Sequence, residues 1–251
     1  MAEEQKFPTE IIDLPSGGKI YGKDSPLYDG KIEIKYMTAK EEDILTSQNL
    51  IKKGRVIETL IDSLIVTSGV KTDDMILGDK NAIMVAARIL AYGPDYTATI
   101  SLPKTDEIIE HTFNLADCPF KELDKSIDLT VNSFDCDLPT SKTKIKFKIL
   151  TGHEEKEIEK ELDSMKKLNK AYSPELTTRL RRVITEVDGS TDQSVINGFV
   201  ENMLSRDSLY LRKEIAKIAP DIELSQEIEI EGETVKVDIP MTVNFFWPST
   251  E

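Results

Sequence analysis

The chain has 251 residues, 39% of them hydrophobic, and a net charge of −14. This size suits one large or two small globular domains. The excess of 46 acidic over 32 basic residues disfavours a nucleic-acid binder, because phosphate contacts need clustered Lys and Arg. No apolar stretch approaches the ~20 residues of a membrane span, and the acidic N-terminal stretch lacks the apolar segment of a signal peptide. We therefore expect no nucleic-acid partner and no membrane contact.

The cysteines and histidines offer no recognisable metal site. Cys118 and Cys136 lack C-x-x-C spacing and are expected to be reduced thiols. Together with His111 and His153 they could gather a zinc ion, but their spacings match no common finger or ribbon. The glycines of LPSGGKIYG lack the spacing of a phosphate-binding loop. The expectation is no metal and no cofactor.

Residues 1–37 read as an N-terminal strand and loop segment. The alternation in KIEIKYM (31–37) predicts a half-buried strand. Thr38 with Glu41 three residues later predicts a capping box, and the helix it opens is expected to reach Gly54.

Two further helices are predicted before the first strands of the middle region. One covers residues 55–66. The other, NAIMVAARILAY, is expected to be capped by Asp79 and to end at Gly93, with Arg88 solvated at the edge of its apolar stripe or paired across an interface.

Alternating stretches then predict β structure. DYTATISL, EIIEHTFNL and IDLTVNSF read as strands, and FDCDLP with KIKFKIL reads as a hairpin through Thr140 and Ser141.

The last hundred residues are predicted to be mainly helical. A charged helix over 154–170 carries a thin apolar stripe that suits a single partner helix, on this chain or on another. A second helix is expected from Pro174 to about Asp188, and a third begins at Thr191 or Asp192. EIEIEGETVKVDIP predicts a hairpin that leads into the aromatic strand MTVNFFWPST.

The predicted fold class is α+β, with helical layers that carry β-hairpin subdomains. The segments expected are 1–37, 38–150 (helices, then β-hairpins) and 151–251 (helices, then a hairpin and the aromatic strand).

The stretch NMLSRDSLYLRKEI places Arg206, Asp207 and Ser208 side by side. Ser205 can cap a helix that begins at Arg206, and Asp207 then favours the helix dipole. A catalytic interpretation needs a base near Ser205 or Ser208, and the two histidines come without a recognisable triad motif. We therefore interpret this stretch as a helix–helix junction, with Arg206 and Asp207 as candidate partner-binding residues.

Three adjacent large aromatics lie near the C-terminus: Phe245, Phe246 and Trp247. Side chains alternate along a strand, so not all three can face one side. They are candidates either for the core or for a partner contact.

Four stretches, taken in order, resemble the baseplate hub and hub-assembly proteins of T-even-like contractile-tailed phages. They are LPSGGKIYG with GKIEIKYMTAKEEDIL; ILGDKNAIMVAARILAYG; LRRVITEVDGSTDQSVINGFVENMLSRDSLYLRKEIAKIAPDIEL; and IPMTVNFFWP. The pairing of ENMLSRDSLYLRKEI with FFWP is the most specific part. Members of that family often carry C-x-x-C pairs where this chain has SLPKTDEIIEHTF and EIEIEGETVKVDIP. The resemblance therefore implies degenerate zinc-ribbon-like hairpins held by apolar packing, without a metal.

The resemblance implies a tail morphogenesis factor that is not an enzyme. It would bind other baseplate hub proteins in the host cytoplasm and promote hub assembly. A permanent structural subunit of the virion baseplate hub is the alternative, and a serine hydrolase using Ser205 or Ser208 is less favoured. The sequence leaves the oligomeric state open.

Overall fold

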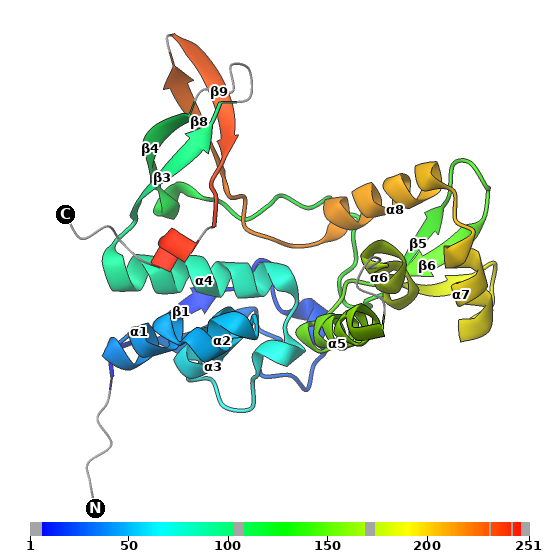
Figure 1. The fold of residues 1–251 in the computed structure, drawn as a ribbon, viewed down its shortest axis with the longest axis horizontal. Coiled ribbons are helices and arrows are strands. Elements are labelled where there is room, and N and C mark those ends of the chain that lie inside the picture. Colours follow the sequence, from blue (N-terminus) through cyan, green and yellow to red (C-terminus); the bar gives the residue numbers. More distant parts are fainter. Residues whose placement is uncertain (1–6, 103–107, 169–173, 231, 242, 247–251) are drawn as a thin grey trace, which may run out of the picture.

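The computed structural model describes residues 7–102, 108–168, 174–230, 232–241 and 243–246 (Figure 1). Within these residues, eight α-helices combine with nine β-strands in four small antiparallel sheets. This arrangement confirms the predicted α+β class.

The elements form two lobes (Figure 1). The elements of the first lobe are β1 (Thr9–Asp13), β2 (Lys31–Lys35), α1 (Ala39–Thr46), α2 (Gln48–Lys52), α3 (Val56–Leu64), α4 (Leu77–Tyr92), β3 (Asp95–Ser101), β4 (Ile108–Asn114), β8 (Ser225–Ile230), β9 (Glu233–Asp238) and the 3-10 turn η4 (Val243–Phe246). The elements of the second lobe are β5 (Phe134–Asp137), β6 (Lys144–Phe147), α5 (Gly152–Leu168), α6 (Glu175–Val183), β7 (Ile184–Val187), α7 (Gln193–Glu201) and α8 (Ser205–Ile218).

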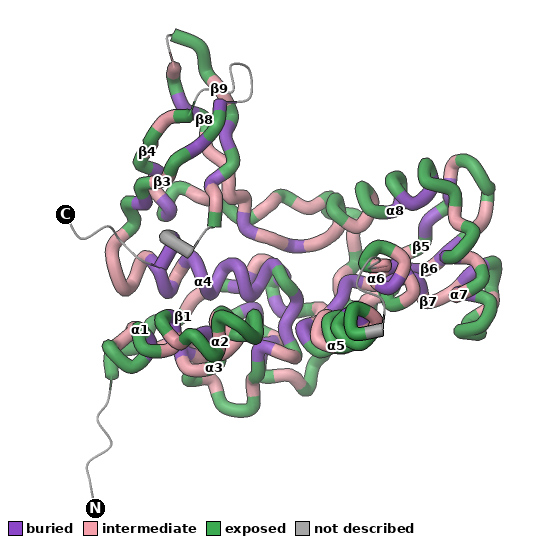
Figure 2. The backbone as a smooth tube through the Cα atoms, in the orientation of Figure 1, coloured by how far each residue is buried: buried purple, intermediate pink, exposed green. Residues whose placement is uncertain are grey.

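The centre of the first lobe is α4, most of which is buried (Figure 2). The layer of α1–α3 and β1 lies on one side of this helix, and the hairpins β3–β4 and β8–β9 rise from the other (Figure 1). Apolar residues from all these elements except α2 form one core. Burial of both faces explains why α4 is apolar over most of its circumference.

The first helices follow the sequence signals with two corrections. The Thr38–Glu41 capping box is confirmed, since the Thr38 N–H donates to Glu41 at 2.9 Å. The predicted single helix up to Gly54 is wrong, because extended backbone at Ser47 divides it into α1 and α2. Asp79 is not the cap of α4, which begins one turn earlier after Ile76.

Asp79 binds the N-terminal loop instead of capping its helix. Its carboxylate accepts hydrogen bonds from the Ser16 backbone N–H at 3.0 Å, the Ser16 hydroxyl at 2.6 Å and the Tyr21 hydroxyl. Burial raises the pKa of this carboxyl, although these hydrogen bonds oppose the shift.

Arg88 is neither solvated nor paired across an interface, as the sequence had suggested. It is buried and donates to the Gly93 and Asp95 carbonyls just beyond α4, each at 3.1 Å.

The stretches DYTATISL and EIIEHTFNL, predicted as strands, form β3 and β4 and pair with each other, and the predicted hairpin β8–β9 is confirmed. The predicted C-terminal aromatic strand (241–250) is wrong over residues 243–246, which form the 3-10 turn η4, while residues 242 and 247–250 of this prediction lie outside the described residues. This turn places the adjacent rings of Phe245 and Phe246 together in the core, which a strand could not do.

The second lobe has its own core around the sheet β5–β6–β7. The β5–β6 hairpin is confirmed. The helix from Pro174 stops at Val183, and Ile184–Val187, in which every residue except Glu186 is β-branched, pairs with β6 instead. Likewise, the strand predicted over 127–134 is wrong, since β5 begins only at Phe134.

The charged helix α5 packs on α6 of the same chain. Ile158 and Leu162 are buried in the second core, whereas the side chain of Leu168 lies outside the described residues. Arg182 of α6 forms ion pairs with Glu157 at 3.1 Å and Glu161 at 3.5 Å. Ile158 and Leu162 of the apolar stripe therefore pack within the chain.

In sequence, the second core lies between two parts of the first. Buried residues of the first core come from 14–115 and 222–246, and those of the second from 136–211. The chain thus leaves the first lobe after β4 and returns before β8. The division into segments 1–37, 38–150 and 151–251 stays a prediction.

Candidate functional site

The junction between the lobes is held by close backbone contacts at two glycines. A Cβ atom on Gly78, at the start of α4, would lie 1.9 Å from the Pro220 carbonyl oxygen. A Cβ atom on Gly152, at the start of α5, would lie 2.6 Å from the Thr72 carbonyl oxygen. The Gly152 N–H also donates to the Met75 carbonyl at 2.9 Å. Only glycine permits these approaches, so the junction is set by backbone geometry.

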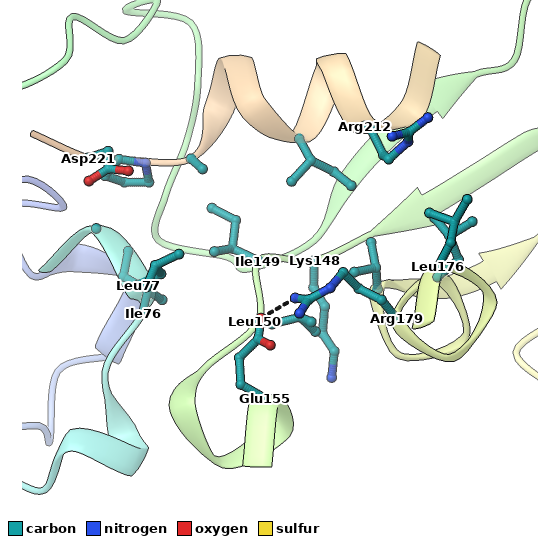
Figure 3. A pocket seen from close by; sticks show the side chains of 16 residues that line it. Ile76, Leu77, Lys148, Ile149, Leu150, Glu155, Leu176, Arg179, Arg212 and Asp221 are labelled. Carbon is teal, nitrogen blue, oxygen red and sulfur yellow. Dashed lines mark hydrogen bonds and ion pairs between the residues drawn. The ribbon is translucent and has the colours of Figure 1, made fainter. Parts of the chain in front are cut away.

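A cavity of about 240 Å³ lies at this junction (Figure 3). Its lining comes from the start of α4, from the segment after β6, from α5 and α6, and from α8 with the linker that follows it. The lining residues are Ile76, Leu77, Gly78, Lys148, Ile149, Leu150, Glu155, Leu176, Arg179, Leu180, Val183, Arg212, Ile215, Ala219, Pro220 and Asp221. We name this site the inter-lobe pocket.

The inter-lobe pocket is mainly apolar, with exposed leucines on opposite sides. Leu77 of the first lobe is 60% exposed, and Leu176 of the second lobe is 42% exposed (Figure 3). Ile149 and Leu150 lie between them and are buried. Large hydrophobic side chains left open around a concavity are typical of ligand or protein contact sites.

Two of the three cations that line the pocket are already paired. Arg179 binds Glu155 (Figure 3, dashed line), and Lys148 binds Glu154. Burial raises the pKa of Glu154, but hydrogen bonds from Lys148 and from the Thr151 backbone outweigh it and hold this pKa below its ordinary value.

The third cation, Arg212, is exposed. Among the described residues it has no ion pair, and its Nε donates only to the Ser208 carbonyl of its own helix at 3.4 Å. The pocket therefore presents one unpaired guanidinium beside an apolar surface.

The RDS stretch lies at the start of α8, as expected, but its residues act differently. Ser205 is the first helical residue and forms no cap, since Leu204 occupies the N-cap position. Asp207 is fully buried and accepts backbone N–H groups from Thr140 at 2.8 Å and Ser141 at 2.9 Å. This carboxylate thus fixes α8 to the β5–β6 turn.

Arg206, in contrast, is exposed and has no ion pair within the described residues. Phe245 and Phe246 are 1% and 4% exposed, and the Phe245 ring meets Tyr96 edge-to-face at 5.1 Å. Trp247 lies outside the described residues. A partner-binding role for Arg206, Asp207, Phe245, Phe246 and Trp247 stays a prediction, and the buried members could contribute to it only by holding neighbouring surface in place.

Neither candidate serine meets a base in the described part of the chain. The Ser208 hydroxyl is buried without a hydrogen-bond partner there. His111 packs on Phe113 in β4 with ring centroids 4.8 Å apart, and His153 pairs with Glu157 on α5 at 3.5 Å. The geometry of a serine–histidine pair is not present among these four side chains.

A second cavity, of about 430 Å³, lies beside β5 and is rich in carboxylates. Its lining includes the thiol of Cys136 together with Asp135, Asp137 and Glu214. Burial, with Glu214 and Asp137 adding to it, raises the pKa of Cys136 to about 11. The thiol is therefore protonated at neutral pH and is a poor nucleophile.

The described residues show no cluster of three or more His, Cys, Asp or Glu side chains that could hold a metal ion. The same residues contain no helix with the length and apolar character needed to cross a membrane. Cys118 and Cys136 are free, and they belong to different lobes, the former against the first core and the latter within the second.

The pocket residues were not singled out from the sequence. Leu77, Leu176 and Arg212 stand in three different helices, and each looks like an ordinary surface or stripe position. Gly78 and Gly152 are the only local signals, because a glycine in a first helical turn suggests a close backbone approach.

The fold defines a two-lobed α+β protein with a mainly apolar pocket at the junction of its lobes. A family of T4 bacteriophage base plate proteins has a model that matches residues 7–247 of this chain. The chain belongs to this family, and it is a phage baseplate protein. No curated protein and no solved structure matches the chain.

Proposed function

We propose that the protein is a tail morphogenesis factor that binds baseplate hub components and promotes assembly of the hub. The family membership and the resemblance to hub and hub-assembly proteins support this role. It would act in the host cytoplasm by holding a hub subunit in an assembly-competent form or by templating its neighbours. No step of this role requires a bond to be made or broken, so we infer that the protein is not an enzyme.

The observation that carries the proposal is the inter-lobe pocket. It combines a concave apolar surface with exposed leucines from both lobes and one unpaired cation. Interfaces gain most of their energy where a large side chain fills such a pocket and excludes water. A partner bound there would contact both lobes together.

A permanent structural subunit of the baseplate hub is the second candidate. The close contacts at Gly78 and Gly152 favour it, because they fix the two lobes by backbone packing and suit a rigid building block. Both candidates require protein binding. They differ in whether the protein remains in the finished tail.

The test compares finished particles with extracts of infected cells. Affinity-tagged protein is purified from the extract, and its co-purifying hub components are identified by mass spectrometry. Finished particles are then analysed for the same protein. Hub components in the extract with none of this protein in particles support an assembly factor, whereas stoichiometric copies in particles identify a permanent subunit.

Purified protein that binds no hub component would contradict both candidates. A Ser208→Ala variant separates them from a hydrolase in a complementation assay. The Ser208 hydroxyl has no hydrogen-bond partner among the described residues, so its removal breaks no described hydrogen bond and should change stability little. Loss of particle formation without loss of folded protein would favour the hydrolase.

A further inference from the structure

The inter-lobe pocket is large enough for an aromatic side chain. Its volume of about 240 Å³ exceeds the ~150 Å³ of an apolar protein cavity that accommodates benzene. Protein interiors leave few voids of this size, because side chains pack at near-crystalline density. An apolar cavity that stays open at a junction therefore has room for a group from outside the chain.

The charges around the pocket restrict what lies next to that group. Of the acidic lining residues, Glu155 is neutralised by Arg179, and Asp221 accepts hydrogen bonds from Asn81 at 3.0 Å and the Ile222 N–H at 2.8 Å. Arg212 is left without a carboxylate among the described residues. A guanidinium pairs best with a carboxylate, which it can bind through two parallel hydrogen bonds.

Arg212 and Leu176 lie on the same side of the pocket, opposite Leu77 (Figure 3). A carboxylate that meets Arg212 would therefore enter beside the apolar group rather than across the pocket from it. The chain has a net charge of −14 and repels acidic segments in general. An unpaired cation is therefore the feature that would let an acidic segment bind at this one place.

We infer that the inter-lobe pocket receives an aromatic-sized apolar side chain from a partner protein, and that Arg212 binds a carboxylate adjacent to it. The inference rests on the proposed function, because it names the chemistry of the partner at the proposed site. The lining belongs to both lobes, so one such side chain would bridge them.

The direct test uses blocked tetrapeptides as probes of the full chain. Acetyl-Gly-Phe-Glu-Gly-amide is compared with two matched peptides, in which either Phe is replaced by Ala or Glu is replaced by Gln. Binding is followed by two-dimensional NMR, with shifts expected at residues that line the pocket. The parent peptide should bind, and both replacements should weaken binding.

Two variants on α8, each of which removes an exposed cation, separate binding at the pocket from a general effect of charge. Arg212→Gln should weaken binding of the Glu peptide about tenfold, as expected for one charge-assisted hydrogen bond, and should leave the Gln peptide unaffected. Lys213→Gln, which removes an exposed cation outside the pocket lining, should leave the binding of both peptides unchanged. Leu77→Lys should weaken the binding of all the peptides, because it places a charge beside the apolar group.

Three outcomes would overturn the inference: no shifts with millimolar parent peptide, shifts outside the pocket, or equal effects of Arg212→Gln and Lys213→Gln. The co-purification of hub components is measured separately with the same variants. Hub binding that survives both Arg212→Gln and Leu77→Lys would sink the inference and leave the proposed function standing. If the unaltered protein binds no hub component, the proposed function itself is contradicted.

Discussion

The contact between Asp207 and the β5–β6 turn offers a sharp test of how the second lobe is held together. Asp207 is fully buried, and its two carboxylate oxygens accept the Thr140 and Ser141 backbone N–H groups at 2.8 and 2.9 Å. In Asp207→Asn, one oxygen becomes an NH₂ group that faces an N–H donor. The variant thus removes one charge-assisted hydrogen bond and leaves the side-chain volume unchanged.

Asp207→Asn is expected to lower the free energy of unfolding of the second lobe by about 2 kcal/mol. Hydrogen bonds to a charged acceptor contribute about 1.5–3 kcal/mol each, and the lower part of that range applies because water reaches the exposed turn. Asp163→Asn is the matched control, since Asp163 is exposed on α5 and makes no described hydrogen bond or ion pair. Its effect should stay within about 0.5 kcal/mol.

The pH dependence of this contribution has a definite sign. Burial raises the pKa of Asp207, but the Thr140 and Ser141 N–H groups outweigh it and hold this pKa below its ordinary value. A carboxyl whose pKa is lower in the folded state stabilises the fold above its unfolded pKa of about 3.9. The difference between the native protein and Asp207→Asn should therefore be full at neutral pH and shrink as pH falls through the lower, folded pKa.

Hydrogen exchange read by mass spectrometry is the suitable assay, because it reports the protection of each of the two cores separately. Peptides from β5, β6 and α8 should exchange about 30-fold faster in Asp207→Asn, which corresponds to about 2 kcal/mol. Peptides from α4 should change little. Equal protection in the two proteins, or a difference in urea stability that persists undiminished at about pH 3, would refute the reasoning.

Three further predictions test the junction, the first core and the thiols. Gly78→Ala should lower the free energy of unfolding by about 1–3 kcal/mol, because the added methyl group overpacks against the linker. In the control Gly198→Ala the added methyl group meets no atom within 4 Å, so this change should be neutral or stabilising by about 0.5–1 kcal/mol. Thermal unfolding compares the two variants. Phe245→Ala should cost about 3–5 kcal/mol in urea denaturation, and a loss below about 1 kcal/mol would contradict its place in the core. Cys136, whose pKa burial raises to about 11, should resist iodoacetamide near neutral pH until urea is added; rapid alkylation of the folded protein, seen by mass spectrometry, would speak against this environment.

Local signals in the sequence were sufficient for most element types. The sequence predicted the Thr38–Glu41 capping box, a helix start at Thr191 or Asp192, the strands β3 and β4, and the hairpins β5–β6 and β8–β9, because each depends on side chains within a few residues of one another. Two of the errors occurred where distant partners decide the backbone. Residues 184–187 continue a helical pattern but pair with β6, and residues 243–246 form a turn that buries both phenylalanine rings.

The sequence by itself determined the α+β class, the resemblance to a baseplate family and the interpretation of the RDS stretch as a helix junction. These depend on composition, local periodicity and short-range capping, which are properties of neighbouring residues. Only the tertiary structure decided where Asp207 binds and that Leu77, Leu176 and Arg212 share one pocket. Those positions come together because two lobes meet at Gly78 and Gly152, and the packing of distant segments leaves no periodic trace in the chain.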